Sequence, residues 1–443
     1  MTTSRHRLVR LWRRHRLRIA ALLLAGAAWP LAAQAPPPDL CGCRNHPGSL
    51  GAFDTRNQAT WPPGTTLNVR TLTIPLPADG VLVFDSIHLE WSSASPVPCC
   101  SVDVVFGRNA ANTPVTLLVK GDVTIRNNAR INVSGEPGLR GSDDTFGRGG
   151  LGGPGGFRGG DGAYRMVNLA GNGGAGLGPG GGSPGTGSPL SAGGGGTFVA
   201  SADLLPLVGG SGGGGGGSSS ASLGCSGGGG GGGGGAILIA ANGRIVLDGE
   251  ILADGGAGAP VWDFGCSSWG GSGSGGAIRL VASSIAGSGF LGARGLVIGG
   301  PPAGSPGSIR LEAFDNTFPM ASRASPVAVG SLTPGPIVNP LMPSVAVTAV
   351  GGQPVPQPPQ GVFGAVDVQI PAPGPTRIDL QTAGVPAGTT VEVKVKPRVG
   401  GAPATSTATL SACDGTGGCT ASVTFDLPAG AYVVEARATF QTP

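Results

Sequence analysis

The sequence predicts an all-β protein, in which a parallel β-helix with long glycine-rich insertions at one corner is followed by a small β-sandwich. The first observation is that glycine-rich sequence runs three times into a short apolar segment, at residues 236–240, 277–281 and 308–312. The second is that 64 of the 87 glycines lie between Gly135 and Gly307. The third is a proline-rich stretch at 334–343, after which short alternating apolar segments resume.

The N-terminus has the features of an export signal. Seven arginines between Arg5 and Arg18 precede an apolar core at 19–31 that is short for a membrane span. Ala33-Gln34-Ala35 supplies a small-residue cleavage site, and a retained signal anchor is the alternative. We predict a signal peptide over residues 1–35 and an exported protein, located in the periplasm, at the cell surface or outside the cell.

Removal of the signal peptide changes the charge. Seven of the 28 basic residues and none of the 24 acidic residues lie in the first 35 positions, so the remaining chain has a net charge of −3. A nucleic-acid partner is therefore not expected. No later segment reaches the length of an apolar span, so we also expect no membrane span after signal removal.

The even number of cysteines, eight, fits an oxidising compartment. Cys413 and Cys419 flank a five-residue loop and are expected to pair, and Cys225 with Cys266 is a candidate pair across two insertions. The pairing of the other four is left open: Cys41, Cys43, Cys99 and Cys100.

A zinc site is the competing explanation for these cysteines. Beyond the signal, the chain has only His46 and His88 and no paired Cys-x-x-Cys spacing. We therefore expect neither a metal nor another cofactor.

The first strands of four predicted repeats align at 115–119, 236–240, 277–281 and 308–312. Side chains alternate between the two faces of a strand, so the second and fourth columns should face the core together. These columns are Thr116, Ile237, Ile278, Ile309 and Leu118, Ile239, Leu280, Leu311. The column between them should face outward: Leu117, Leu238, Arg279 and Arg310.

Second and third strands follow at similar short spacings, at 123–125, 245–247 and 285–287, and then at 131–133, 251–253 and 291–293. Three short strands per repeat are typical of one coil of a parallel β-helix. The repeats begin 121, 41 and 31 residues apart, so the coils are regular and the insertions after the third strand vary. Stacking of coils at about 4.8 Å should place Arg130 next to Glu250 and Asp254 next to Arg294.

The flanking regions complete the predicted organisation. Residues 36–64 form an N-terminal segment, and strand-like stretches at 71–74, 81–84 and 102–106 should supply early, less regular coils. The predicted β-helix spans 65–333 and the proline-rich linker 334–343. Alternating segments with turns every 8 to 15 positions predict the β-sandwich over 344–443.

The polyglycine tracts Gly212–Gly217 and Gly227–Gly235 allow two interpretations. They are either flexible spacers or extended glycine helices packed side by side, since the lack of a Cβ lets backbones approach closely. Insertions that leave from the same corner can stack, which favours the ordered interpretation.

Several stretches together resemble a group of glycine-rich exported bacterial proteins that are mostly uncharacterised. These stretches are 112–135, 204–212, the polyglycine leading into 236–239, and 275–282. The fold of that group is similar to the right-handed parallel β-helix of pectin lyases, and the likeness covers about residues 65–315. The group's motifs imply no assigned activity. The tail after residue 343 resembles bacterial immunoglobulin-like modules.

Pectin-lyase-like enzymes use carboxylates that hold calcium and an Arg or Lys base on one outward ladder of strands. The matching ladder here offers Arg279 and Arg310 with Glu312, but Leu117 and Leu238 fill the neighbouring places. No carboxylate pair stands opposite a basic residue on adjacent coils. A non-enzyme is therefore predicted, with a polysaccharide lyase or glycoside hydrolase as the alternative.

Other catalytic and ion-binding patterns are weak. His88 beside Glu90 is expected to be an ordinary surface or satisfied histidine. Asp143, Asp144, Asp161 and Asp203 are expected to lie in solvated turns, because the calcium-binding nonapeptide repeat is absent.

Ligand binding is a further possibility. Trp262, Phe264 and Trp269 cluster in one insertion and could stack on sugar rings, while Arg279 and Arg310 lie on the outward ladder. The competing interpretation is that these aromatic residues form a small packing cluster. Together these features predict a structural or adhesive protein of the surface or matrix, whose partner is a polysaccharide or another surface component.

Overall fold

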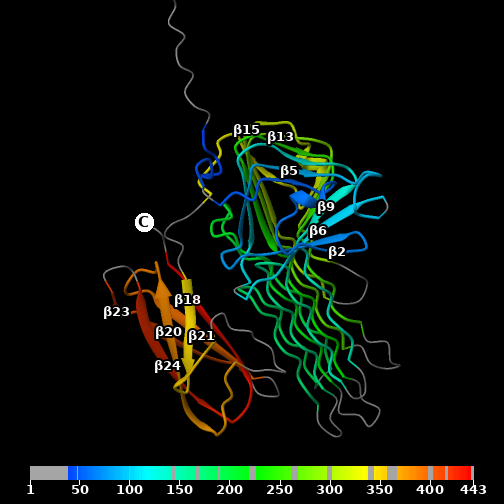
Figure 1. Ribbon diagram of the computed structural model, residues 1–443. Helices are drawn as coiled ribbons and strands as arrows, with labels where there is room; N and C mark the ends of the chain where they lie inside the picture. The colour runs from blue at the N-terminus through cyan, green and yellow to red at the C-terminus, as the bar shows by residue number, and fades with distance from the viewer. Residues whose placement is uncertain are drawn as a thin grey trace, which may run out of the picture. The chain divides into compact units, whose positions relative to one another are not determined.

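The computed structural model describes residues 38–46, 48–98, 100–110, 112–141, 145–164, 170–187, 190–218, 226–260, 268–296, 302–337, 344–356, 367–397, 403–414 and 418–440. The described chain is almost entirely β (Figure 1). Its helices are a short 3-10 turn, η1 (Gln58–Thr60), and one turn of α-helix, α2 (Met320–Arg323). Within these residues, none of the helices has the length and apolar character needed to cross a membrane. The predicted signal peptide lies outside the described residues.

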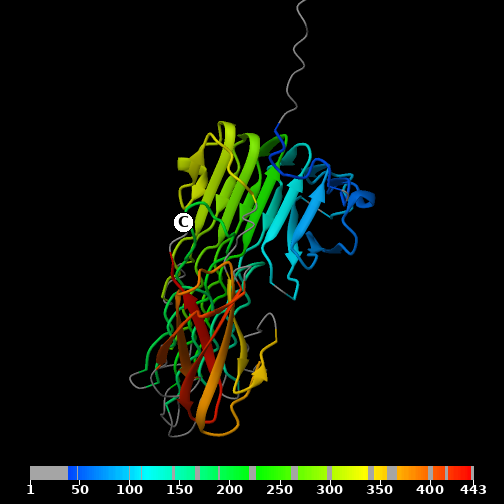
Figure 2. The same ribbon diagram turned by 90° about the vertical axis from the view of Figure 1, so that its left-hand side faces the viewer.

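The larger of two parallel sheets has ten strands. They are β1 (Ala52–Asp54), β4 (Val81–Phe84), β5 (Ser86–Leu89), β7 (Val115–Val119), β8 (Val123–Ile125), β10 (Ala236–Ala241), β11 (Arg244–Leu247), β13 (Ala277–Ala286), β15 (Ser308–Asn316) and β17 (Val329–Ser331). Figure 2 shows its neighbouring strands side by side, from blue early strands to yellow late ones. Strands that lie next to each other in space thus come from successive repeats of the sequence.

The second sheet has seven strands in the order β16-β14-β12-β9-β6-β3-β2. They are β2 (Thr66–Asn68), β3 (Thr71–Pro75), β6 (Val102–Gly107), β9 (Ala129–Asn132), β12 (Glu250–Leu252), β14 (Phe290–Gly292) and β16 (Ala324–Ser325). All pairs in this sheet are parallel except β2 with β3. The early strand-like stretches of the sequence are thus β3, β4 and β6, paired onto later strands.

The register confirms most of the strand alignment. Ile237 pairs with Ile278 and Ile278 with Ile309, as expected for the first strands. Ile245 pairs with both Val123 and Ile285, and Ile251 with both Ile131 and Leu291. The ladder contacts are also present, because Arg130 lies 3.8 Å from Glu250 and Arg294 donates from its backbone to Asp254 at 2.7 Å.

One strand was predicted one residue out of register. Ile239 pairs with Leu117 rather than with Leu118, so Val115, Leu117 and Val119 are buried while Thr116 faces outward. A one-residue slip moves every side chain of a strand to the other face. The strand itself carried the signal, since its polar residue Thr116 belongs on the outward side. The outward column is therefore Thr116, Leu238, Arg279 and Arg310.

A second difference concerns the corner between first and second strands. The chain bends at this corner in the early repeats. β13 instead runs unbroken from Ala277 to Ala286, through the expected first strand and into the expected second strand. β15 likewise extends to Asn316. The expected second strand at 285–287 is therefore the end of a longer strand.

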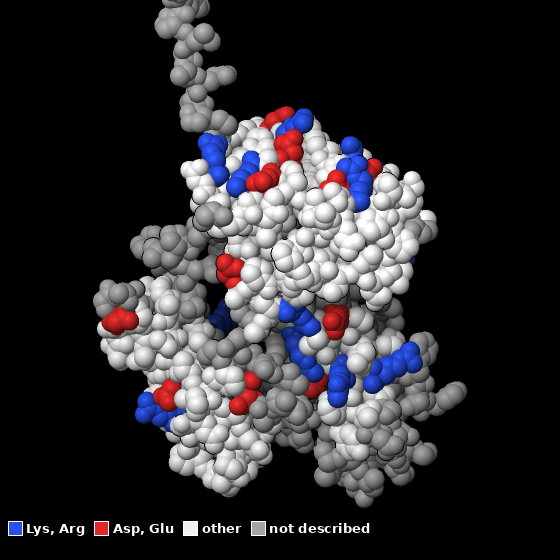
Figure 3. All heavy atoms as spheres, viewed as in Figure 1, with Lys and Arg blue, Asp and Glu red and all other residues white. Residues whose placement is uncertain are grey.

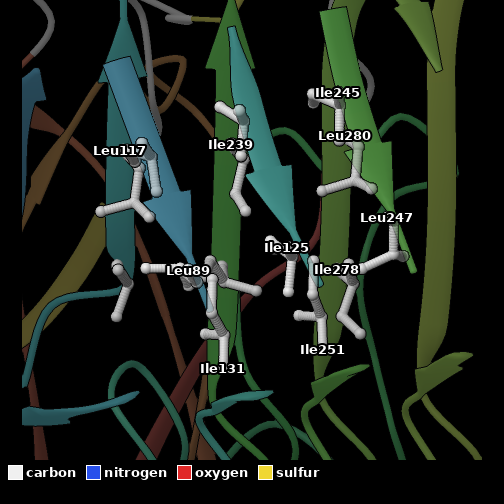
Figure 4. Packing of buried hydrophobic residues seen from close by; sticks show 14 of the residues in the cluster. Leu89, Leu117, Ile125, Ile131, Ile239, Ile245, Leu247, Ile251, Ile278 and Leu280 are labelled. Atoms are coloured by element: carbon white, nitrogen blue, oxygen red, sulfur yellow. The ribbon is translucent and has the colours of Figure 1, made fainter. Parts of the chain in front are cut away.

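The apolar core lies between the two parallel sheets. Leu89, Leu117, Ile125, Ile131 and Ile239 come from five strands of both sheets and point toward one another (Figure 4). Each is at most 3% exposed. Because the contributing strands belong to different repeats, no single repeat could bury its apolar face alone.

The described glycine-rich residues between 133 and 307 form extended segments that lie side by side (Figure 1), which we call the glycine bundle. Gly227–Gly235 is an interior segment. Its N–H groups at 227, 230 and 233 bond segment 157–163, those at 228, 231 and 234 bond segment 268–274, and those at 229, 232 and 235 bond segment 133–139, all at 2.7–3.0 Å. Segments 147–153, 210–216 and 256–259 donate to its carbonyl groups.

This rotation of partners follows from an extended helix with three residues per turn. Such a helix makes no internal hydrogen bonds, and its successive N–H groups point in three directions about 120° apart. Each glycine of 227–235 therefore bonds outward, and the tract is surrounded by six segments. The ordered interpretation of the polyglycine tracts agrees with the structure.

Side chains are excluded from the polyglycine tract at the centre of the bundle. A Cβ at any position of Gly227–Gly235 would overlap a backbone oxygen of a neighbouring segment. At the margin, segment 133–141 has glycine only at every third position, and Gly135 and Gly138 face the interior tract, while Leu139 and Arg140 are exposed. A segment packed against neighbours on every side needs glycine at every position, whereas a segment packed on one side needs it only at every third position.

The described residues after 343 form two antiparallel sheets with a core of their own. The first contains β18 (Ser344–Val350), β19 (Gln353–Pro354), β20 (Gly374–Ala383), β23 (Ala412–Cys413) and β24 (Cys419–Leu427). The second contains β21 (Thr390–Pro397), β22 (Ala404–Thr409) and β25 (Tyr432–Ala438). Ile378 and Leu380 of one sheet share a buried cluster with Val391 and Val393 of the other.

Candidate functional site

Two arginines and a glutamate form a charge cluster on the outward face of β13 and β15. Arg279 and Arg310 are register neighbours, and Glu312 follows two residues along β15. Glu312 Oε1 accepts from Arg279 Nε at 2.9 Å and from Arg310 Nε at 2.7 Å, while its Oε2 accepts from Arg279 Nη2 at 3.2 Å. Arg279 is 2% exposed and Glu312 is fully buried, so this part of the predicted ladder is covered.

The chain that follows β17 covers the cluster. The Gly335 N–H donates to Glu312 Oε2 at 2.6 Å, and Arg279 Nη2 donates to the Pro336 carbonyl at 2.9 Å. Asp203, from the glycine-rich insertion before β10, lies 3.4 Å from Arg310 Nη2. Two segments far apart in sequence thus contact side chains of the same charge cluster.

The N-terminal segment covers a neighbouring part of this face. Cys41 and Cys43 form a disulfide and pack against Val83, Leu238 and Ala240. The Cys41 N–H donates to the Asn242 side chain at 3.1 Å, and Asn242 in turn donates to Asp39 at 2.9 Å. Leu207 and Ile337 join the same apolar cluster. We call residues 39–43, Leu207 and 335–337 the covering segments.

Electrostatics keep Glu312 ionised despite its burial. Desolvation by burial raises its pKa, but hydrogen bonds from Arg279, the Gly335 N–H and Arg310 lower it, and the net pKa lies below the ordinary value. The two arginines therefore balance the charge of the Glu312 carboxylate. The negatively charged carboxylate accepts the hydrogen bond from the Gly335 N–H. Such a carboxylate is a poor proton donor at neutral pH.

The aromatic candidates are only partly described. Trp269 is half-buried in the glycine bundle, where its carbonyl accepts from the Gly193 N–H at 2.8 Å. Trp262 and Phe264 lie outside the described residues. Sugar stacking by these rings therefore stays a prediction.

The cysteines form the expected local loop closure and a second local pair in the N-terminal segment. Cys413 pairs with Cys419, as predicted, and Cys41 pairs with Cys43. Cys100 is also disulfide-bonded, whereas Cys99, Cys225 and Cys266 lie outside the described residues. Asp39 and the sulfurs of Cys41 and Cys43 lie close enough for a metal, but joined sulfurs are not thiolate ligands.

His88 and its neighbours form a ladder of polar side-chain contacts. His88 Nε2 lies 2.9 Å from Glu90 Oε2, which also lies 3.1 Å from Arg56 Nη1, and Arg56 pairs with Asp54 at 2.7 Å. All four side chains are at least a quarter exposed. This ladder agrees with the expectation of a satisfied histidine.

One acidic residue differs from expectation. Asp161 is 2% exposed inside the glycine bundle, where it accepts from the Gly149 N–H at 2.8 Å and pairs with Arg158, so it is not in a solvated turn. Asp203 is exposed, and Asp143 and Asp144 lie outside the described residues.

Sequence reasoning missed the covering segments. Two signals pointed to them: Leu238 is apolar in an outward column, and Leu204-Leu205-Pro206-Leu207 interrupts a glycine-rich insertion with apolar residues. Neither signal indicates which segment covers which strand, because any apolar partner could bury these side chains.

No family model, curated protein or solved structure matches this chain significantly.

Proposed function

We propose that this is an exported, non-enzymatic protein of the cell surface or matrix with a structural or adhesive role. In this proposal the two parallel sheets are faces of a right-handed parallel β-helix of the pectin-lyase-like type, and the two antiparallel sheets form an immunoglobulin-like module. The observation that carries the proposal is the glycine bundle, whose central tract Gly227–Gly235 packs so closely against neighbouring backbone that no position has room for a Cβ. Such an interior serves as a rigid support rather than as a reactive cleft.

The covered outward face supports the same proposal. In the alternative, a polysaccharide lyase or glycoside hydrolase, the polymer would have to reach Arg279, Arg310 and Glu312. Arg279 and Glu312 are instead buried and paired with each other beneath residues 335–336. A substrate could approach them only after the protein's own chain had moved away.

The surface charge also fits a passive role. On the face seen in Figure 3, basic and acidic side chains mostly lie close to one another, between broad areas of neither sign. Paired charges of this kind do not create the single-sign field that attracts a polyelectrolyte over long range. We infer that any polysaccharide partner is recognised by contact rather than by bulk charge.

A single experiment tests the proposal. The chain from residue 36 is incubated with a panel of acidic and neutral polysaccharides, and retention and release of new chain ends are measured together. We expect no cleavage. Cleavage that is abolished by Arg310→Ala would overturn the structural role, whereas retention without cleavage that is lost in Trp262→Ala or Trp269→Ala would identify a carbohydrate-binding surface.

A further inference from the structure

The last rung of the parallel sheets carries a group of exposed apolar side chains. Phe314, Val327, Val329 and Leu332 are 53–68% exposed. They come from β15, from β17 and from the residues flanking β17. Large apolar side chains gathered at one end of a sheet mark an interaction surface more often than scattered ones do.

The backbone at this end is also incompletely paired. β13 pairs with β15 from Ser308 to Asn316, whereas β17, its other described partner, covers only Arg310–Glu312. Within the described residues, no second strand is paired with the rest of β15, so this part of the strand presents an edge beside Phe314. A free strand edge next to apolar side chains favours association with another chain.

Two opposite charges flank the apolar group. Asp315 follows Phe314 in β15, and Arg323 ends α2, which is held next to β17 because Met320 lies against Gly330. Both charged side chains are exposed, and within the described part of the chain neither makes an ion pair. In a two-fold dimer, each contact occurs twice with the roles exchanged, so Asp315 of one copy can meet Arg323 of the other.

We propose that a second copy of this chain docks on this end and forms a two-fold dimer. The interface is centred on Phe314, Val327, Val329 and Leu332, and Asp315 and Arg323 set its orientation. The apolar group supplies the affinity, and the reciprocal charges distinguish a closed pair from open head-to-tail growth.

The molar mass of the chain from residue 36 tests this proposal, measured by light scattering and sedimentation equilibrium between roughly 1 and 100 µM. We expect twice the chain mass. Asp315→Arg or Arg323→Asp alone should weaken the dimer about tenfold or more, because each change places two like-charged pairs in the interface. The double reversal Asp315→Arg with Arg323→Asp should restore the dimer.

Matched apolar variants complete the test. Leu332→Ser, at a side chain 68% exposed, should weaken the dimer, whereas Val69→Ser, at a side chain 69% exposed in the turn between β2 and β3 at the opposite end of the second sheet, should not. Circular dichroism and thermal unfolding confirm that each variant is folded. A single-chain mass at every concentration, a series of masses beyond the dimer, or a double reversal no better than the single ones would each overturn the proposal.

Discussion

Gly231 shows at the scale of one residue why the polyglycine tract tolerates no substitution. Its N–H donates to the Gly271 carbonyl at 2.9 Å, and a Cβ on it would overlap the Gly256 carbonyl oxygen. The obstacle is backbone on the far side, which cannot rotate out of the way as a side chain can. The interior glycines are therefore required by space rather than by an unusual backbone angle.

We expect Gly231→Ala to destabilise the protein by at least the 1–3 kcal/mol typical of overpacking. Gly107→Ala is the matched control, because a Cβ there meets its nearest neighbour only at 3.8 Å. The loss of stability in each variant is measured from the midpoint of chemical unfolding, followed by circular dichroism. Equal midpoints for the two variants would contradict the close packing described here.

Glu312 is the other residue on which much depends. Replacing it by glutamine leaves Arg279 buried without its counter-charge, and breaking a buried pair in this way costs about 3–5 kcal/mol. Glu136→Gln is the control, since Glu136 is 61% exposed and lies 3.8 Å from Arg108, a surface pair worth at most about 1 kcal/mol. The free energy of unfolding should therefore fall much more in Glu312→Gln than in Glu136→Gln.

Acid should remove the contribution of Glu312. Its folded pKa is lowered, so the stabilisation is fully present above the unfolded value of about 4.3 and is lost as the pH falls through the folded pKa. The wild-type protein should therefore lose more stability than Glu312→Gln between about pH 5 and pH 3. Parallel pH profiles for the two proteins would show that this carboxylate is not held as described.

At the scale of an element, the glycine segments are stabilised by their neighbours rather than by themselves. An extended three-residue helix has no internal hydrogen bonds, so each segment depends on the others for every bond it makes. The bundle should therefore form or dissolve cooperatively. Its entropy cost is high because glycine loses more freedom than any other residue on ordering.

Hydrogen exchange measures this order directly. We expect slow amide exchange across Gly227–Gly235, where all nine N–H groups have carbonyl partners. Exchange should be much faster in Gly231→Ala but not in Gly107→Ala. Exchange at the rate of an unstructured chain throughout the described glycine tracts would favour the flexible-spacer interpretation.

The strand elements show where periodicity is informative. The second and third strands are predicted in their correct registers, because Thr124 and Asn132 of the earliest repeat are polar and mark the outward column of each strand. The first strand of the earliest aligned repeat was misplaced, because Leu117 and Leu118 are both apolar and either can be assigned to the core. The covering segments escaped prediction because their partners come from other repeats.

At the scale of the whole molecule, the described chain contains two separate principal cores. One lies between the parallel sheets, and the other lies between the antiparallel sheets. The buried residues of one cluster do not recur in the other. Division into two domains at the predicted linker, 334–343, remains a prediction that unfolding experiments can test.

We expect two thermal transitions that respond to different substitutions. Gly231→Ala should lower only the transition of the parallel sheets with the glycine bundle. Ile378→Ala removes a fully buried side chain from the other core, which costs about 2–5 kcal/mol of unfolding free energy. It should lower the midpoint temperature of the second transition only. A single transition shifted by both changes would show that the two cores unfold together.

The sequence by itself determined the all-β class, the repeat of short parallel strands and most of their registers, because side-chain alternation and turn residues act locally. It also indicated the local Cys413–Cys419 pair, for the same reason. Only the tertiary structure decided which residues cover Arg279 and Glu312, and that each interior glycine segment lies among six neighbours. The covering segments also join residues about 200 positions apart, as Cys41 and Asn242 show, and a glycine carries no side chain from which its neighbours could be inferred.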